Sequence, residues 1–159
     1  MFTKTVIILL ASLSQGKEIL KRRHDEPTPI IDKFLWSSFL NKTGLDPLQY
    51  LKPLSDDTPE TLEPGPDRLV CPVAIAAWSN FTDAEQRISI PAGQCLSATE
   101  ETCRTVACAP RGNVTVASGE ITGRMWNPVS TKCVFGGVGG IWQNDGSTLV
   151  IEMGYASQE

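Results

Sequence analysis

The first 23 residues constrain the rest of the chain most, because they set the compartment in which it folds. A single lysine, Lys4, precedes an apolar segment over residues 5–13, and small or polar residues follow up to Gly16. A charged start, an apolar run of about ten residues and a small-residue end make up a secretory signal peptide. The run is shorter than the roughly 20 apolar residues that span a bilayer. We therefore predict a signal peptide over residues 1–16, no membrane span and a secreted, extracellular product.

A tribasic run, formed by Lys21, Arg22 and Arg23, closes the segment that follows the leader. It is similar to the dibasic sites that furin- and Kex2-like proteases of the secretory pathway cleave. We therefore expect residues 17–23 to form a pro-segment, with the mature chain beginning at Arg23 or His24. The alternative is a charged turn exposed to solvent, because short basic runs commonly lie on the surface.

Composition supports a folded domain and argues against one class of partner. The chain has 159 residues, of which 41% are hydrophobic and 20% are charged, and these values fit a single domain with a core. The first 23 residues contain five basic and one acidic side chain, so their removal lowers the formal net charge from −4 to −8. An acidic chain without basic runs lacks the positive surface that binds phosphates. We therefore expect no nucleic-acid partner.

Five cysteines lie after residue 70, and in a secreted chain they predict disulfide bonds. They are Cys71, Cys95, Cys103, Cys108 and Cys133. No CxxC pair occurs and no histidine lies nearby, so we expect neither a zinc site nor another cofactor. Because five is odd, at most two bridges form within the chain and one thiol is left over, most often as a buried core residue. The pairing stays open, with short closures expected among Cys95, Cys103 and Cys108 and an approach of Cys71 to Cys133 as strand residues.

The segment before the cysteines is predicted to be helical and then linker-like. Thr28 can cap a helix that has Pro29 as its first residue, and Gly44 can end it. Apolar residues recur between them at spacings of three and four. We expect a helical segment over residues 24–54, which either packs on the following domain or serves as a removable pro-segment. Residues 55–68 are rich in acidic residues and proline and predict a linker.

From residue 69 onward the apolar residues alternate with a period of two, which predicts strands. The alternating stretches are 69–77, 86–91, 113–116 and 119–126. Together with the cysteines they predict a mainly β fold, a small disulfide-bonded β-sandwich or barrel over residues 69–159, preceded by the short helical N-terminal segment.

The C-terminal stretch 139–155 contains the strongest hairpin signal in the chain. Asp145 and Gly146 suit a two-residue type I′ loop, because both central positions of that turn have positive φ. In the resulting register Trp142 lies opposite Leu149 on an apolar face. The other face is also apolar near its middle, so we expect the hairpin inside the fold and Trp142 in the core.

One surface is a candidate for partner binding. Glu120, Thr122, Arg124 and Trp126 would share a face of the strand predicted over residues 119–126. Tryptophan and arginine are enriched among the residues that carry most of the energy of protein interfaces. We therefore predict that these four residues contact a partner. The alternative is that a loop or the N-terminal helix covers Trp126.

Signals for catalysis are weak. The single histidine, His24, lies at the predicted cleavage site, so the residues after it lack the usual general base and the Ser–His and Cys–His pairs. Acidic side chains such as Asp83 with Glu85, or Glu120 with Glu152, could meet in space, but their spacing does not require it. The glycine-rich run before the hairpin lacks the Lys-Ser/Thr of a phosphate loop and predicts a bulge or a close sheet crossing. We therefore do not expect an enzyme.

Three sequons of the N-x-Ser/Thr type are candidate glycosylation sites. They begin at Asn41, Asn80 and Asn113. In the third sequon the predicted alternation turns Asn113 toward solvent, which a glycan requires.

The leader, the tribasic site, the short mature length and the cysteine-bearing β domain together resemble the small secreted cysteine-rich proteins of fungi. That group includes host-directed effectors, toxins and inhibitors. The resemblance covers the leader, the tribasic site and residues 69–159, while the odd number of cysteines departs from the evenly paired pattern of the group. It implies a secreted, non-enzymatic effector or toxin-like protein that binds a host or competitor protein.

Two alternatives stay open. A secreted carbohydrate-binding module would stack sugar rings on Trp126 together with Tyr155 or Trp78, and it would need at least two exposed aromatic side chains on one surface. A small secreted hydrolase that uses carboxylates would need acidic side chains that converge in a cleft with raised pKa values.

Overall fold

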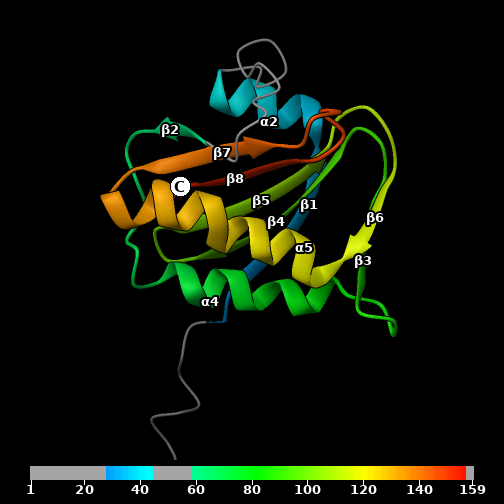
Figure 1. Cartoon of the computed structure of the whole chain (residues 1–159), viewed down its shortest axis with the longest axis horizontal. Coiled ribbons are helices and arrows are strands. Elements are labelled where there is room, and N and C mark those ends of the chain that lie inside the picture. The colour runs from blue at the N-terminus through cyan, green and yellow to red at the C-terminus, as the bar shows by residue number, and fades with distance from the viewer. Residues whose placement is uncertain (1–27, 45–58, 157–159) are drawn as a thin grey trace, which may run out of the picture.

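A six-stranded antiparallel sheet organises the protein. The computed structural model describes residues 28–44 and 59–156 (Figure 1). Within these residues the strands lie in the order β1-β4-β5-β8-β7-β2. Their bounds are β1 Ile30–Leu35, β2 Glu60–Leu62, β4 Gln94–Glu100, β5 Cys103–Ala109, β7 Gly139–Gln143 and β8 Val150–Tyr155. A two-stranded sheet pairs β3 (Arg87–Ile90) with β6 (Val114–Ala117).

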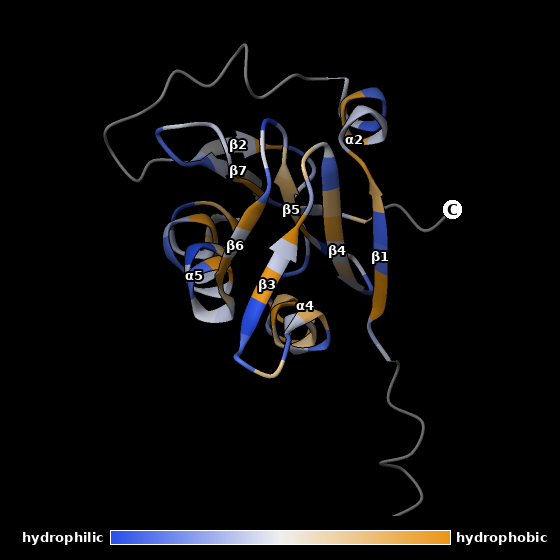
Figure 2. Cartoon of the chain, turned by 90° about the vertical axis from the view of Figure 1, so that its right-hand side faces the viewer, coloured by the Kyte–Doolittle hydropathy of each residue, from blue (hydrophilic) through white to orange (hydrophobic). Residues whose placement is uncertain are grey.

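Helices cover both faces of the large sheet. Helix α2 (Trp36–Thr43) lies on one face, whereas α4 (Cys71–Ala76) and α5 (Ser118–Arg124) lie on the other (Figures 1 and 2). Three short helical turns complete the elements of the described residues, η1 Ala77–Phe81, η2 Met125–Ser130 and η3 Val134–Gly136. The fold is therefore mixed α/β and dominated by the sheet. The predicted predominance of β structure is confirmed, whereas the predicted barrel is wrong because the sheet is not closed, and helices cover most of its faces in place of the second large sheet of a sandwich.

Two apolar clusters lie on the two faces of the sheet. The larger one, under α4, α5 and η2, includes Trp78, Ile88, Ile121, Met125, Ile151 and Met153. The smaller one, under α2, includes Phe39, Cys95, Val106, Cys108, Ile141 and Val150. Because both faces are buried, β5 and β8 are almost continuous buried runs and lack the polar alternation of a sheet with one solvated face.

The predicted alternation is confirmed in β3 and β6. Ile88 and Ile90 are buried, while Arg87 and Ser89 are exposed, and Figure 2 shows this pattern as alternating colours along β3. Val114 is buried in the paired strand β6. This small sheet therefore turns its apolar face toward the larger cluster, which holds all three of these apolar side chains.

The N-terminal segment is only partly helical, so the helix predicted from Pro29 to Gly44 is wrong over its first half. Ile30–Leu35 form the edge strand β1, which pairs with β4, and α2 begins at Trp36. β-Branched residues at the start of the segment favour the strand. The predicted end is confirmed, because Gly44 has φ +66° and its N–H donates to the carbonyl oxygen of Leu40 at 2.9 Å.

The end of the predicted linker takes part in the sheet. Strand β2 pairs with β7, with Leu62 opposite Gly139. A Cβ atom at Gly139 would lie 2.7 Å from the carbonyl oxygen of Met153. A Cβ atom at Gly140 would lie 2.7 Å from Sγ of Cys133. Close packing therefore requires glycine at these two positions of β7, although no crossing of two sheets occurs there.

The strand predicted over residues 69–77 is wrong, because this stretch forms α4 and the start of η1. Its buried side chains recur at helical spacing. They are Cys71, Ala74, Ile75, Ala77 and Trp78. Pro72 lies in the first turn of α4, where its missing N–H removes no hydrogen bond, and the alanines of the stretch favour a helix. The apolar residues here fit both a period of two and a period near 3.6.

The strand predicted over residues 119–126 is wrong for the same reason. Ile121, Met125 and Val129 are buried at a spacing of four, and the first of them belongs to α5. The helical path continues into η2 and is interrupted at Asn127, which has extended φ and ψ of −141° and 116°.

The C-terminal hairpin forms as β7 and β8, but its register differs from the predicted one by two residues. Trp142 lies opposite Ile151 and not Leu149. Ser147 takes the positive φ, at 48°, in place of the two predicted loop residues. The Asn144 carboxamide oxygen accepts the N–H groups of Thr148 and Leu149 at 2.9 and 3.0 Å, which lengthens the loop. A shift of two residues keeps each side chain on its predicted face.

Two disulfide bonds form and one thiol is left over, as predicted. Cys71–Cys103 joins α4 to β5, and Cys95–Cys108 joins directly opposed residues of β4 and β5. Cys133 is unpaired and buried beside Gly140. The predicted approach of Cys71 to Cys133 is wrong, because Cys71 lies on a helix and not on a strand.

We expect non-reducing peptide mapping of the intact protein to find Cys71–Cys103 and Cys95–Cys108. Cys133 should react with a thiol reagent only after unfolding, because burial hides the thiol and raises its pKa. Replacing Cys95 and Cys108 by alanine should lower the free energy of unfolding by about 2–4 kcal/mol. Rapid labelling of one thiol in the folded protein would contradict this assignment.

Trp78 is the fully buried tryptophan of the larger cluster. Its indole Nε1–H donates to Oγ1 of Thr105 at 2.8 Å, and this hydroxyl donates to the carbonyl oxygen of Ala98 at 2.9 Å. Trp142, which was predicted to be in the core, is half-buried and packs against the cluster from its edge. Trp126 is 40% exposed.

We expect Trp78→Ala to lower the free energy of unfolding by about 3–5 kcal/mol, because it opens a cavity and leaves Thr105 without its indole partner. Trp126→Ala should cost about 1 kcal/mol or less, and Trp142→Ala should fall between the two. Urea unfolding of the three variants measures these differences. A larger loss for Trp126→Ala than for Trp78→Ala would show that the burial of the two side chains is wrongly assigned.

The predicted signal peptide, the pro-segment and the tribasic run lie outside the described residues, as does His24. The parts of the predicted helical segment and linker that cover residues 45–58 lie outside them too. Across residues 28–44 and 59–156, no helix has the length and apolar character needed to cross a bilayer.

Candidate functional site

The four predicted contact residues do not share one face. Because Glu120, Thr122 and Arg124 lie on helix α5, side chains two residues apart point in different directions. Arg124 lies over the ring of Trp142, with its guanidinium carbon 4.8 Å from the ring centre. Thr122 and Trp126, four residues apart, line one groove. The structure therefore brings this pair together and separates it from Arg124.

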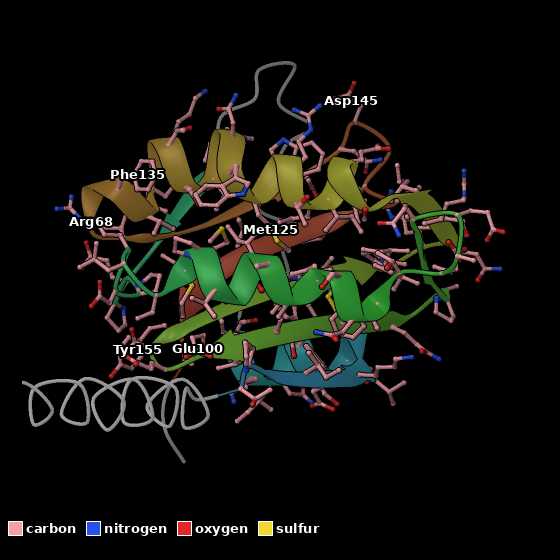
Figure 3. The ribbon with its side chains drawn as sticks, turned by 90° about the horizontal axis from the view of Figure 1, so that it is seen from below. Arg68, Glu100, Met125, Phe135, Asp145 and Tyr155 are labelled. Carbon is pink, nitrogen blue, oxygen red and sulfur yellow. A yellow bond between two sulfur atoms is a disulfide. The ribbon has the colours of Figure 1, made fainter. Side chains whose placement is uncertain are left out.

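The groove lies between α4–η1 and α5–η2, and we call it the Trp126 groove. Figure 3 shows these two helical segments side by side on the face of the molecule that is seen from below. The groove has a volume of about 280 Å³. Its walls include Pro72, Ile75, Ala76 and Ser79 from α4–η1 and Ser118, Thr122 and Trp126 from α5–η2. None of the side chains that line it is charged.

Exposed apolar side chains continue from the groove along α4. Leu69, just before this helix, is 77% exposed, and Val73 is 45% exposed. Pro72 and Ala76 are exposed on the same helix and line the groove as well. A cluster of exposed apolar residues around a tryptophan is typical of a surface that another molecule covers.

A second pocket lies on the other face of the sheet, between α2, β1, β4 and β5, and we call it the Arg104 pocket. It has a volume of about 310 Å³. Its polar lining includes Asp32, Lys42, Ser97, Thr99 and Arg104, and its apolar walls include Ile30, Phe34 and Phe39. Sequence reasoning missed this pocket, since the sequence shows no signal that brings α2 over β4 and β5.

Arg104 forms a buried ion pair with Glu152 of β8. Nη2 of Arg104 donates to both carboxylate oxygens, at 2.9 and 3.1 Å. The side chains are 15% and 4% exposed. Burial raises the pKa of Glu152, and the charges of Arg104 and Lys42 oppose that rise. The ionised pair is therefore costly to bury, although its partners are well placed.

We expect the stabilising effect of the protonated Glu152 to be lost as pH rises. Because its pKa in the folded protein lies above the ordinary value of 4.5, the folded state keeps a proton that the unfolded state has released. The free energy of unfolding should therefore fall as pH rises through the folded pKa. Glu152→Gln keeps a hydrogen-bond acceptor for Arg104 and removes the titration. Its unfolding free energy should lack this fall, and parallel pH profiles of the two proteins would contradict the assignment.

The acidic residues considered for catalysis do not converge. Asp83 accepts the N–H groups of Glu85 and Arg87 with one carboxylate oxygen, at 3.1 and 2.7 Å, and so closes a turn. Glu120 lies on α5, whereas Glu152 points to the opposite face of the sheet. Among the described residues no group of three His, Cys, Asp or Glu side chains is placed to hold a metal ion.

The aromatic residues considered for sugar stacking are also apart. Trp78 is buried and cannot meet a ligand. Tyr155 is exposed next to Glu100, across α4 from α5–η2 (Figure 3). Trp126 is the single aromatic side chain among those that line its groove.

The three sequon asparagines, Asn41, Asn80 and Asn113, are all exposed, as glycan attachment requires. They lie on α2, on η1 and just before β6. Their occupancy stays a prediction.

Comparison of the chain with protein-family models, with curated protein sequences and with solved structures finds no match.

Proposed function

We propose that this protein acts by binding another protein through the Trp126 groove, as a secreted, non-enzymatic effector or toxin-like protein. The observation that carries the proposal is the 40% exposed Trp126 beside an uncharged groove. When a partner buries an exposed aromatic side chain, the apolar surface of that side chain is removed from water, and this stabilises the complex.

The chemistry of the groove favours an uncharged or apolar segment of the partner. Serine, threonine and glutamine side chains at its walls can exchange hydrogen bonds with a main chain, while a charged group would lose its hydration without gaining a counter-charge. The groove volume of about 280 Å³ suits one or two side chains and not a large ligand. The exposed Leu69 and Val73 extend the contact surface beyond the groove.

The two disulfide bonds support a protein that folds in an oxidising compartment. The leader and the tribasic run in the sequence support the secretory route to it. A host or competitor protein is the partner that the resemblance to small secreted fungal proteins implies.

The structure offers less support for the alternatives. A sugar-binding surface would need a second exposed aromatic side chain near Trp126, and neither Trp78 nor Tyr155 lies there. A carboxylate hydrolase would need two acidic side chains in one cleft, and no acidic side chain lines the Trp126 groove.

We expect Trp126→Ala to weaken binding of the partner by about 2 kcal/mol, a loss of about 30-fold in affinity. Ala76→Arg should weaken binding as well, because it introduces a charge at an exposed position of the groove wall. The immobilised wild-type chain would first be used to capture extracellular proteins of candidate hosts and competitors. Each retained protein would then be purified and titrated against each variant by calorimetry.

Phe135→Ala is the matched control, since Phe135 is 49% exposed on η3 and does not line the groove. It should leave the affinity unchanged within about twofold. Equal binding by the wild type and a folded Trp126→Ala variant would overturn the proposed function.

A further inference from the structure

We propose that the Arg104 pocket binds a small organic carboxylate, on the face of the sheet opposite the Trp126 groove. The two sites lie on different faces, so this proposal does not depend on the proposed function. It is carried by a largely buried arginine, 15% exposed, which lines a pocket that has hydroxyl groups and aromatic walls.

The guanidinium of Arg104 is incompletely paired. Its hydrogen bonds to Glu152 come from Nη2 alone, and both carboxylate oxygens share that nitrogen. Nε is buried and has no hydrogen-bond partner. An arginine carries five N–H donors, and a buried donor without an acceptor destabilises the structure that holds it. Nε itself is enclosed, but the side chain as a whole is 15% exposed and lines the pocket, so a ligand carboxylate would accept hydrogen bonds from the Nη donors.

Other polar side chains line the pocket around Arg104. Lys42 of α2 contributes a second cation, and Ser97 and Thr99 of β4 contribute hydroxyl groups. Ser97 is buried as a residue and yet faces the pocket. Asp32 is the one carboxylate of the lining, and it is exposed on β1, where one of its oxygens accepts the N–H of Lys33 at 2.7 Å. Solvent screens the repulsion between this exposed carboxylate and an anion, and Glu152, which pairs with Arg104, does not line the pocket.

The apolar walls define the rest of the ligand. Phe34 of β1 and Phe39 of α2 line the pocket together with Ile30. A volume of about 310 Å³ lies at the lower end of the range for small-molecule sites. The ligand is thus a carboxylate with a small aromatic or aliphatic body, because inorganic anions would leave the apolar walls without contacts.

The test is a titration of the intact, disulfide-bonded protein with sodium benzoate, observed through the side-chain Nε–H resonance of Arg104 by NMR. Benzamide has the same ring without the charge, and inorganic phosphate has the charge without the ring. We expect a saturable shift of the Arg104 resonance with benzoate and at least about tenfold weaker binding of the other two compounds. No saturable shift, or equal binding of benzoate and benzamide, would overturn the proposal. Preference for phosphate would reassign the pocket to inorganic anions and overturn it as well.

Two variants leave Arg104 and Glu152 in place and test the position of the site. Ser97→Leu should fill the pocket and abolish the benzoate shift, and Lys42→Gln, on the exposed side of α2, should weaken binding several-fold without disturbing the core. Arg111→Gln is the matched control, because Arg111 is exposed between β5 and β6 and does not line the pocket. If Ser97→Leu fails to fold, Lys42→Gln alone decides. Wild-type benzoate affinity in Lys42→Gln, or in a folded Ser97→Leu, contradicts the assignment.

Discussion

Strand β5 holds the rest of the structure together. Cys103 ties it to α4, Thr105 accepts the indole N–H of Trp78 from η1, and Cys108 ties it to β4. Arg104, between the first two, pairs with Glu152 of β8. A disulfide and a buried hydrogen bond thus fasten the same helical segment, α4–η1, to one strand. Because that segment forms one wall of the Trp126 groove, the shape of the groove depends on this attachment.

The alternation of side chains along β5 gives the two faces of the sheet different chemistry. Residues 103, 105 and 107 point to the larger apolar cluster under α4 and α5, and residues 104, 106 and 108 point to the side of α2. The side of α4 and α5 holds the larger apolar cluster, and its outer surface is uncharged at the groove. The α2 side combines the smaller apolar cluster with an ion pair and the polar lining of the Arg104 pocket. The two ligands that we propose, a protein partner on one face and a small carboxylate on the other, follow this difference in chemistry.

The contrast between the two tryptophans follows from the same arrangement. Trp78 is buried because α4–η1 packs flat on the sheet and its indole N–H finds an acceptor in Thr105. Trp126 stays exposed because Met125, its neighbour in η2, takes the buried position of the helix. A helical segment that buries one side exposes the opposite side to solvent. Here the exposed side carries Trp126, which we propose as the anchor for a partner.

The sequence by itself determined the features that depend on local chemistry. It predicted the alternation in β3, the hairpin of β7 and β8 and the helix end at Gly44. It also predicted that five cysteines form two disulfide bonds and leave one thiol unpaired. The tertiary structure decided between helix and strand for residues 71–76 and 118–124, because their apolar side chains fit both periods and only packing on the sheet chooses one. It decided the disulfide pairing, since Cys71 meets Cys103 only when α4 crosses β5. It also created both candidate sites, because each is lined by elements far apart in the chain, and no local pattern encodes their approach.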